Sequence, residues 1–293
     1  MKILVIGDFH GKFPEKLRKK IKEDKIDLVV SVGDYSGIED WRPIIMKRLA
    51  AARKGKRVPK PEEIVGKEKF KKLLDKDFEA GRDVLKILDD FHKPVFLIFG
   101  NGDDEWYKYP FDKDVNFVKK RNLNFLKELK NIKVITYNKI NFKDITFVGF
   151  GGYMDIDAYF DMIETHSSKK SKNLKKRINR REKSKWKLRN LLKKTLKKNI
   201  FVFHYPPKGF FDIIKDKKDN PMNGKSAGIN FFTEAIKKYK PELVLCGHMH
   251  EYQGVKKLGK TFLLNPGAAV DGKAAIVDLD EKRGKVKNVR FLS

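Results

Sequence analysis

Side chains that could bind a metal ion follow several short apolar runs of this sequence. These side chains are Asp8 and His10 after MKILVIG, Asp34 after LVVSVG, Asn101 and Asp103 after VFLIFG, His204 after IFVF, and His248 and His250 after LVLCG. Runs of this length, rich in β-branched and aromatic residues, predict buried strands. In extended chain, residues i and i+2 point to the same side, so Asp8 and His10 could converge on one ion. We therefore expect these strand ends to bring Asp, Asn and His side chains to one edge.

The placement of the histidines supports this prediction. Four of the 6 histidines follow the predicted strands, and only His92 and His166 do not. Carboxylate, imidazole and amide oxygen together suit a borderline divalent ion, whereas ligands that are all oxygen would suit Mg²⁺ or Ca²⁺. We expect ions of this kind, with manganese as the first choice and iron, nickel, cobalt or zinc as alternatives.

The ordered motifs DFH, GD, GN, H and GHMH, between Asp8 and His250, resemble those of the calcineurin-like metallophosphoesterase family. The resemblance implies a ligand set for two ions. Asp8, His10 and His250 would hold the first ion, Asn101, His204 and His248 would hold the second, and Asp34 would bridge them. It also gives Asp34 and Asn101 catalytic roles and makes the nucleophile a hydroxide that bridges the two ions. Two ions about 3.5 to 4 Å apart can activate a shared water and clamp phosphoryl oxygens.

The family resemblance also implies the fold. The expected architecture is α/β, a four-layer α/β/β/α sandwich with two mixed sheets, formed by one metallophosphoesterase domain over residues 1–293. The sequence itself shows alternating strand and helix patterns followed by a strand-rich tail. A helical insertion is expected at about residues 39–92, broken near Pro59 and Pro61.

One position departs from the family pattern. In much of the family a histidine follows the Asn of the GN motif and assists the leaving group, but here that position is Gly102. Asp103 comes next, and an ionised carboxylate is a poor proton donor unless its pKa is raised. We therefore expect good leaving groups, and phosphodiesters in particular, to be favoured. Three further acids, Asp155, Asp157 and Asp161, face either the site or water, and we favour water.

The net charge of +28 suggests a polyanionic partner. A basic helical segment at about residues 168–198 supplies much of this charge, since residues 169–198 carry 16 Lys or Arg against one acid, Glu182. Leu188, Leu191, Leu192 and Leu196 form a helical stripe within it. The segment is either a crossover helix with a solvated Lys face or a surface that contacts nucleic acid or a membrane.

Two features bear on the location of the protein. The single cysteine, Cys246, excludes an internal disulfide and fits a reducing compartment. No apolar run approaches the about 18 residues of a membrane span, and no cleavable signal is recognised. We therefore expect a cytoplasmic protein without a transmembrane segment.

The predicted function is that of a phosphoesterase with two metal ions that favours phosphodiesters. A nuclease or RNA-processing phosphodiesterase that uses the basic segment is the first alternative. A non-catalytic scaffold that retains the fold is the second. Intact metal positions weigh against the scaffold, because scaffolds of this family tend to lose them.

Overall fold

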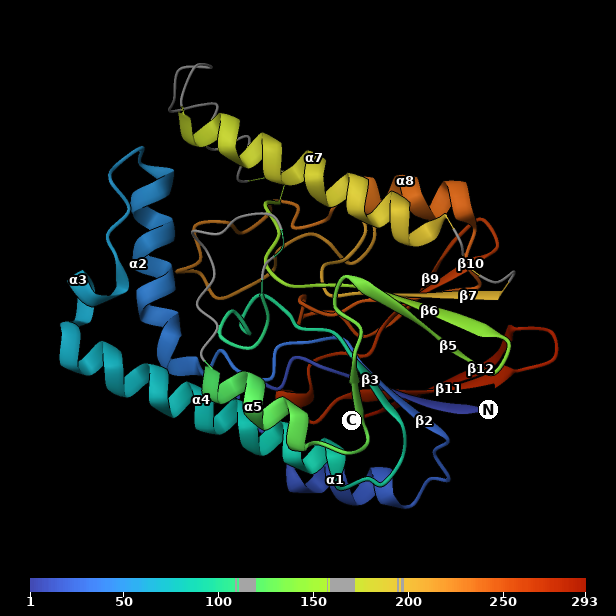
Figure 1. Ribbon diagram of the computed structural model, residues 1–293. Helices are drawn as coiled ribbons and strands as arrows, with labels where there is room; N and C mark the ends of the chain where they lie inside the picture. Colours follow the sequence, from blue (N-terminus) through green and yellow to red (C-terminus); the bar gives the residue numbers. More distant parts are fainter. Residues whose placement is uncertain (109, 111–119, 157, 159–171, 194, 196–197) are drawn as a thin grey trace.

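The computed structural model describes residues 1–108, 110, 120–156, 158, 172–193, 195 and 198–293. Two mixed six-stranded sheets pack face to face, with helices on their outer faces (Figure 1). This arrangement confirms the predicted four-layer α/β/β/α sandwich. His166, Asp157 and Asp161, named above, lie outside the described residues.

The first sheet has the strand order β12-β11-β1-β2-β3-β4. Its strands are β1 (Lys2–Ile6), β2 (Leu28–Ser31), β3 (Val95–Leu97), β4 (Ile132–Val134), β11 (Ala274–Asp280) and β12 (Lys285–Leu292). Strands β1 to β4 are parallel, whereas β11 and β12 add to β1 in antiparallel hairpin fashion. The carboxyl ends of β1, β2 and β3 therefore lie at one edge of the sheet.

The second sheet has the strand order β5-β6-β7-β8-β10-β9. Its strands are β5 (Asn138–Phe142), β6 (Ile145–Phe150), β7 (Lys198–Phe203), β8 (Leu243–Leu245), β9 (Gly254–Leu258) and β10 (Thr261–Asn265). Strands β6, β7, β8 and β10 are parallel, and the antiparallel strands β5 and β9 form the two edges. The carboxyl ends of β7 and β8 again lie side by side.

Successive residues of the central strands are buried in different layers. On β1, Ile3 and Val5 belong to a cluster made by strands of both sheets, which fills the space between the sheets. Leu4 and Ile6 point the other way and pack with helical residues such as Leu17 and Leu85. Because both faces of these strands are buried, their sequences read as continuous apolar runs.

Helices cover the outer face of each sheet. The described helices are α1 (Glu15–Lys22), α2 (Arg42–Arg53), α3 (Pro61–Val65), α4 (Lys67–Asp89), α5 (Lys120–Glu128), α7 (Lys172–Leu192) and α8 (Asn230–Tyr239), with 3₁₀ turns η1 (Glu39–Trp41) and η3 (Ala269–Asp271). Figure 1 shows α1, α4 and α5 against the first sheet and α7 and α8 against the second. Of the helices that the structure describes, none combines the length and the apolar character needed to cross a bilayer.

The segment between β2 and β3 is helical on both sides of the proline-containing break. Helix α2 ends at Arg53, and Pro61 begins α3, where its missing N–H costs no hydrogen bond. A small separate core, including Ile38, Ile44 and Leu73, joins these helices. The insertion therefore has its own packing beside the sandwich.

Helix α7 occupies the described part of the basic segment, while residues 168–171, 194, 196 and 197 lie outside the described residues. Leu188 and Leu192 are buried in the main core, as expected for a crossover helix. Asp155, expected to face water, is instead buried. Its carboxylate accepts hydrogen bonds from the guanidinium groups of Arg177 and Arg180 on α7. The prediction for Asp155 was wrong because its partners lie on a distant helix.

Candidate metal centre

The polar side chains predicted at the strand ends lie close together. They follow the carboxyl ends of the parallel strands in the two sheets, which meet at one edge of the sandwich. Asp8, His10, Asp34 and His248 all have positive φ angles, of 56°, 47°, 56° and 68°. Such left-handed conformations are unfavourable for residues other than glycine, and they concentrate at functional sites. They turn the chain sharply after the strands. The loop after β1 is fixed to the loop after β2, because Phe9 N donates to the Asp34 carbonyl at 2.8 Å.

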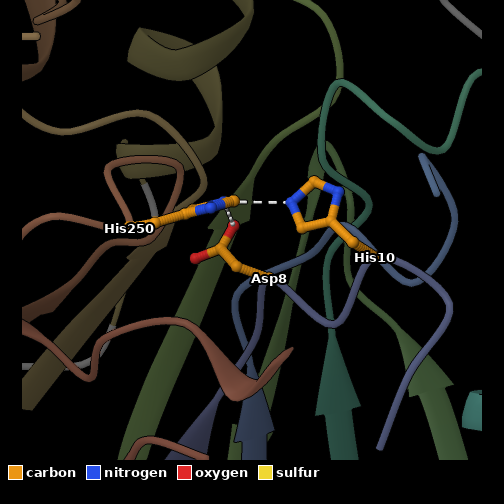
Figure 2. Close-up of side chains that lie close together, drawn as sticks. All are labelled: Asp8, His10 and His250. Carbon is orange, nitrogen blue, oxygen red and sulfur yellow. Dashed lines mark hydrogen bonds and ion pairs between the residues drawn. The ribbon is translucent and has the colours of Figure 1, made fainter. Parts of the chain in front are cut away.

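A first group of side chains contains Asp8, His10 and His250, whose candidate ligand atoms all lie within 4.8 Å of one another. The Nε2 atoms of His10 and His250 are 2.9 Å apart, and His250 Nε2 is 3.8 Å from Asp8 Oδ1 (Figure 2). His10 Nδ1 lies 2.7 Å from the Gly37 carbonyl oxygen. Donation from Nδ1 to that carbonyl leaves Nε2 free to bind a metal ion.

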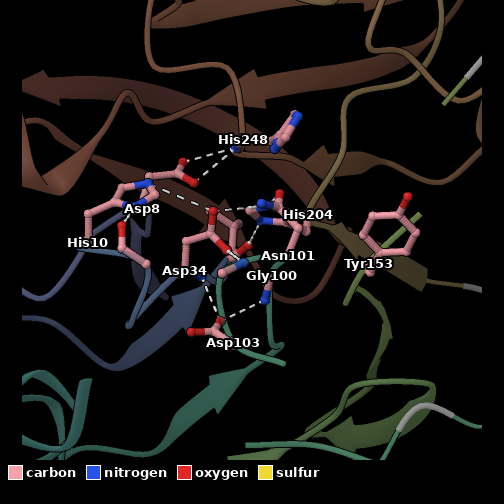
Figure 3. A network of polar contacts seen from close by, with 12 residues as sticks. Asp8, His10, Asp34, Gly100, Asn101, Asp103, Tyr153, His204 and His248 are labelled. Carbon is pink, nitrogen blue, oxygen red and sulfur yellow. Dashed lines mark hydrogen bonds and ion pairs between the residues drawn. The ribbon is translucent and has the colours of Figure 1, made fainter. Parts of the chain in front are cut away.

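A second group contains Asp34, His204 and His248, with candidate ligand atoms again within 4.8 Å of one another. The Asn101 side-chain oxygen lies 2.9 Å from His204 Nε2 (Figure 3). Asp34 Oδ2 is 3.4 Å from His204 Nε2 and 3.8 Å from His10 Nε2. The Asp34 carboxylate therefore lies between the two groups.

The pKa values of these groups in the metal-free protein reflect burial and mutual charge. Burial lowers the pKa of His250, and the neighbouring His10 lowers it further, to about 3. Burial also lowers the pKa of His204, but the Asp34 carboxylate outweighs this effect and raises it to about 9. Burial raises the pKa of Asp8 to about 7. The metal-free centre thus contains buried groups that a divalent cation would stabilise in their ligand forms.

Asp103 does not point into the metal centre. Its side chain is fully buried and accepts four backbone hydrogen bonds, from the N–H groups of Asp34, Tyr35, Ser36 and Gly100 at 2.7 to 3.0 Å. Burial raises its pKa to about 7, and the backbone donors oppose that rise. Asp103 therefore ties the loops after β2 and β3 together and is not placed as a proton donor.

Two glycines leave room for the Asp34 carboxylate. A Cβ atom on Gly100 would lie 2.1 Å from Asp34 Oδ1, so a side chain at this position would displace the carboxylate. Gly102 donates its backbone N–H to the same oxygen at 2.7 Å. A Cβ on Gly102 would lie 3.2 Å from that oxygen, which is tighter than an ordinary van der Waals contact.

Asp77 supports the centre from α4 and was missed by the sequence analysis. Its Oδ1 accepts hydrogen bonds from Gly37 N at 2.8 Å and Ile38 N at 2.9 Å. Gly37 in turn carries the carbonyl that faces His10 Nδ1. The available signal was an acid on the buried stripe of α4, between Leu73 and Gly81 at four-residue spacing.

Comparison with known proteins shows the family to which this chain belongs. The sequence model of the family described as "Metallophosphoesterase, calcineurin superfamily" matches residues 1–289. The chain belongs to this family. A curated relative from Methanocaldococcus jannaschii, "Uncharacterized protein MJ1162", is 27% identical over 292 residues, covering 97% of this chain and 98% of the relative.

Solved structures share the calcineurin-like fold at low sequence identity. One, 18% identical, has a TM-score of 0.65 and covers 100% of this chain and 99% of its own. A dimetal phosphatase from Danio rerio is 11% identical, with a TM-score of 0.50, and the alignment covers 94% of this chain and 92% of that protein. Family membership and the two candidate metal groups together support a metal-dependent phosphoester hydrolase of the two-metal type.

Proposed function

We propose that this metallophosphoesterase hydrolyses phosphodiesters with two divalent ions held at the described centre. Asp8, His10 and His250 would hold one ion, and Asn101, His204 and His248 would hold the other. Asp34, whose carboxylate lies between the two groups, would contact both ions. The observation that carries the proposal is the pair of three-residue groups at one edge, each with ligand atoms within 4.8 Å.

The donor set fits such ions by its chemistry. Imidazole nitrogens, carboxylates and one amide oxygen suit manganese first, and iron, nickel, cobalt or zinc as alternatives. When bound, two divalent ions activate a water and neutralise charge on the phosphoryl oxygens. The chain itself orients the ligands: the Gly37 carbonyl orients His10, the Val32 carbonyl orients His204 at 2.8 Å, and the His248 N–H orients Asp8 at 3.0 Å.

The preference for diesters rests on the absence of an acid at Gly102. Asp103, the next residue, has both carboxylate oxygens bound to backbone N–H groups and is buried behind the Asp34 loop. Without a proton donor at this position, esters with stable leaving groups react more readily than alkoxide esters. A phosphodiester also carries less negative charge than a monoester and needs less charge neutralisation at the centre.

The test is hydrolysis by metal-stripped protein of bis-p-nitrophenyl phosphate and p-nitrophenyl phosphate, with Mn, Ni, Co, Zn or Mg restored one at a time. We expect turnover only with added metal, with the diester cleaved faster. Asp34→Asn, which replaces the shared carboxylate by a near-isosteric amide, should reduce turnover at least ~100-fold. Unimpaired turnover by this variant would contradict the two-metal proposal.

Two other functions remain open to this experiment. A nuclease or RNA-processing phosphodiesterase is favoured by the basic helix α7, which carries Glu182 as its single acid. A non-catalytic scaffold would show no turnover with any metal although it is folded; the assembled metal groups argue against it. A cytoplasmic location also remains a prediction.

A further inference from the structure

Helix α7 carries an exposed stripe that the proposed metal centre does not use. The stripe consists of Lys175, Lys183, Trp186, Arg189 and Lys193, the last directly after the helix. At 100° per residue, these positions lie within about 60° of Trp186 around the helix axis. Trp186 is 65% exposed, the most exposed large apolar side chain among the described residues. The stripe is therefore a tryptophan with cations on either side of it, and one acid, Glu182, lies on the same face at about 40° from Trp186.

The opposite side of α7 is already committed to the protein core. Leu174, Leu188 and Leu192 are buried and 2 to 3% exposed. An amphipathic helix binds a membrane through its apolar face, and that face of α7 is turned inward. Only Ile178, 44% exposed, adds to Trp186 as exposed apolar surface on the helix. The outward face therefore fits a polyanion better than a lipid surface.

The cations of the stripe form no ion pair with an acid within the part of the chain that the structure describes. Glu182, the one acid of the helix, lies near Lys185 at 3.7 Å. Asp155 forms ion pairs with Arg177 and Arg180, which lie outside the stripe. Among the described residues, no carboxylate lies within 4.0 Å of the charged groups of the stripe. Their positive charge is therefore directed to solvent and available to a phosphate backbone.

The position of α7 connects the stripe to the metal centre. The ion pairs of Asp155 fix the first half of α7 to the loop that follows β6. The end of β6 pairs with the end of β7, Phe150 with Phe203, and His204 follows directly. As a crossover helix, α7 runs back against β7, so its amino-terminal half lies toward the edge that carries the centre (Figure 1). Lys175 to Lys193 extends over about 27 Å.

We propose that this α7 stripe binds single-stranded nucleic acid, with the cations contacting phosphates and Trp186 stacking on a base. Cationic tracks with an exposed aromatic side chain are the usual means of binding single strands without sequence preference. The inference deepens the proposed phosphodiesterase function, on which it rests, by naming the substrate class. The leaving group of such a strand is an alkoxide, which would take its proton from solvent because Gly102 supplies none. Lys175 lies in the half of α7 nearer the metal centre, whereas Trp186, Arg189 and Lys193 lie in the far half. A strand bound along the stripe would therefore run from the far half of α7 toward the edge that carries the centre.

The charge of the stripe is tested with the triple variant Lys183→Ala, Arg189→Ala and Lys193→Ala. The matched control removes the same charge from α1 on the opposite side of the molecule, with Lys16→Ala, Lys19→Ala and Lys22→Ala. Binding of fluorescein-labelled oligouridine and oligothymidine is followed by anisotropy over a range of salt concentrations. For the α7 variant we expect the slope of log affinity against log salt to fall by about 2, and the control to retain it.

The stacking contact is tested with Trp186→Ala and Trp186→Phe. We expect about tenfold weaker binding of single strands by Trp186→Ala and recovery of most of the affinity by Trp186→Phe, which retains an aromatic face. A matching duplex, whose bases are already stacked, should bind equally well to the wild type and to Trp186→Ala. Thermal melts of all variants check that each is folded.

Several outcomes would overturn the inference. These are equal oligonucleotide binding by the α7 and α1 triple variants, no effect of Trp186→Ala, or loss by the α7 variant of binding to phosphatidylserine vesicles alone. Wild-type hydrolysis of bis-p-nitrophenyl phosphate, measured in parallel, tests the proposed function separately. If that activity is absent while oligonucleotide binding depends on α7, the proposed function fails and the binding surface stands. If the activity is present but the α7 substitutions do not change oligonucleotide binding, the proposed function stands and the inference about α7 fails.

Discussion

Gly102 stands where the resemblance to the family leads us to expect a histidine, and a side chain at this position would meet its neighbours closely. A Cβ at Gly102 would lie 3.1 Å from the Ser36 carbonyl oxygen and 3.2 Å from Asp34 Oδ1, so both neighbours would have to move by a few tenths of an ångström. We expect Gly102→His to supply a proton donor and raise monoester hydrolysis about tenfold relative to diester hydrolysis. The gain should be larger for phenyl than for p-nitrophenyl esters, because phenolate is the poorer leaving group.

Gly102→Ala is the control for the Gly102→His experiment, since it adds the Cβ without the imidazole. Its ratio of monoester to diester rates should stay close to that of the wild type. If Gly102→His and Gly102→Ala give the same ratio, the absence of the histidine does not set the preference for diesters.

His204 gives a second prediction, because both of its ring nitrogens face acceptor oxygens. Nε2 is 2.9 Å from the Asn101 side-chain oxygen and Nδ1 is 2.8 Å from the Val32 carbonyl. With a pKa of about 9, set by Asp34 against the opposing effect of burial, the metal-free imidazole is protonated at pH 8. A metal ion needs Nε2 without a proton, so binding at pH 8 should release about one proton.

The number of protons released is measured by calorimetric metal titration in two buffers of different ionisation enthalpy. Below pH 9 the apparent affinity should weaken by up to about tenfold per pH unit as the pH falls, and above pH 9 it should level off. His204→Gln removes the titrating group and should remove the proton release. Metal binding by the wild type at pH 8 without proton release would show that His204 is neutral in the metal-free protein.

At the scale of single residues, the sequence predicted where the residues at strand ends lie better than it predicted which way the buried acids point. Asp8, Asp34 and His204 end apolar runs, so local pattern alone placed them at one edge. Asp103 has the same local signal, but its carboxylate is turned toward backbone N–H groups contributed by another loop. Sequence does not record which donors a folded loop presents, so the direction of Asp103 needed the structure.

At the scale of elements, helix α4 of the insertion contributes to the metal centre through Asp77. Asp77→Ala would leave the backbone N–H groups of Gly37 and Ile38 without their acceptor. The Gly37 carbonyl that orients His10 would then lose its support. We expect metal affinity to weaken about 10- to 100-fold, the usual cost of losing a group that orients a ligand.

The readout for Asp77→Ala is the metal dissociation constant measured by calorimetry, together with the thermal midpoint. Asp83→Ala removes an exposed acid from the same helix and should leave metal affinity unchanged. Asp77→Asn keeps a side-chain acceptor and should restore much of the affinity. If Asp77→Ala lowers the thermal midpoint but leaves metal affinity unchanged, Asp77 stabilises α4 without positioning the centre.

The elements themselves were largely predictable, and their tertiary partners were not. Alternating apolar runs and helical stripes indicated the strands and helices, because burial on both faces leaves a strong local pattern. The arrangement of the strands in two sheets was implied by the family resemblance. Asp77 sits in such a stripe, and Asp155 follows β6 as one of several acids. Their partners, the loop after Asp34 and the arginines of α7, are more than 20 residues away. Only the fold brings these residues together.

At the scale of the whole molecule, each candidate metal group takes side chains from both sheets. Asp8 and His10 follow a strand of the first sheet, whereas His250 follows a strand of the second. Likewise Asp34 follows the first sheet, and His204 and His248 follow the second. Neither group can exist unless the sheets are packed together, so metal binding and folding are thermodynamically linked.

Removal of metal should therefore destabilise the whole sandwich. An ion at 100 times its dissociation constant stabilises the folded state by about 2.7 kcal/mol, which corresponds to a thermal midpoint shift of about 4 °C for a chain of this size. We expect manganese added to chelator-stripped protein to raise the midpoint by this amount. Differential scanning calorimetry over a metal titration measures the shift.

Two variants separate specific linkage from a general effect of ions. Asp34→Asn lacks the carboxylate between the two groups and should lose most of the shift, whereas the exposed Asp83→Asn should retain it. The candidate ligands of each group come from both sheets. We therefore expect the rise in thermal midpoint only when the metal ion binds ligands from both sheets at once. A midpoint that rises equally in Asp34→Asn and Asp83→Asn would place the stabilising ions elsewhere on the molecule.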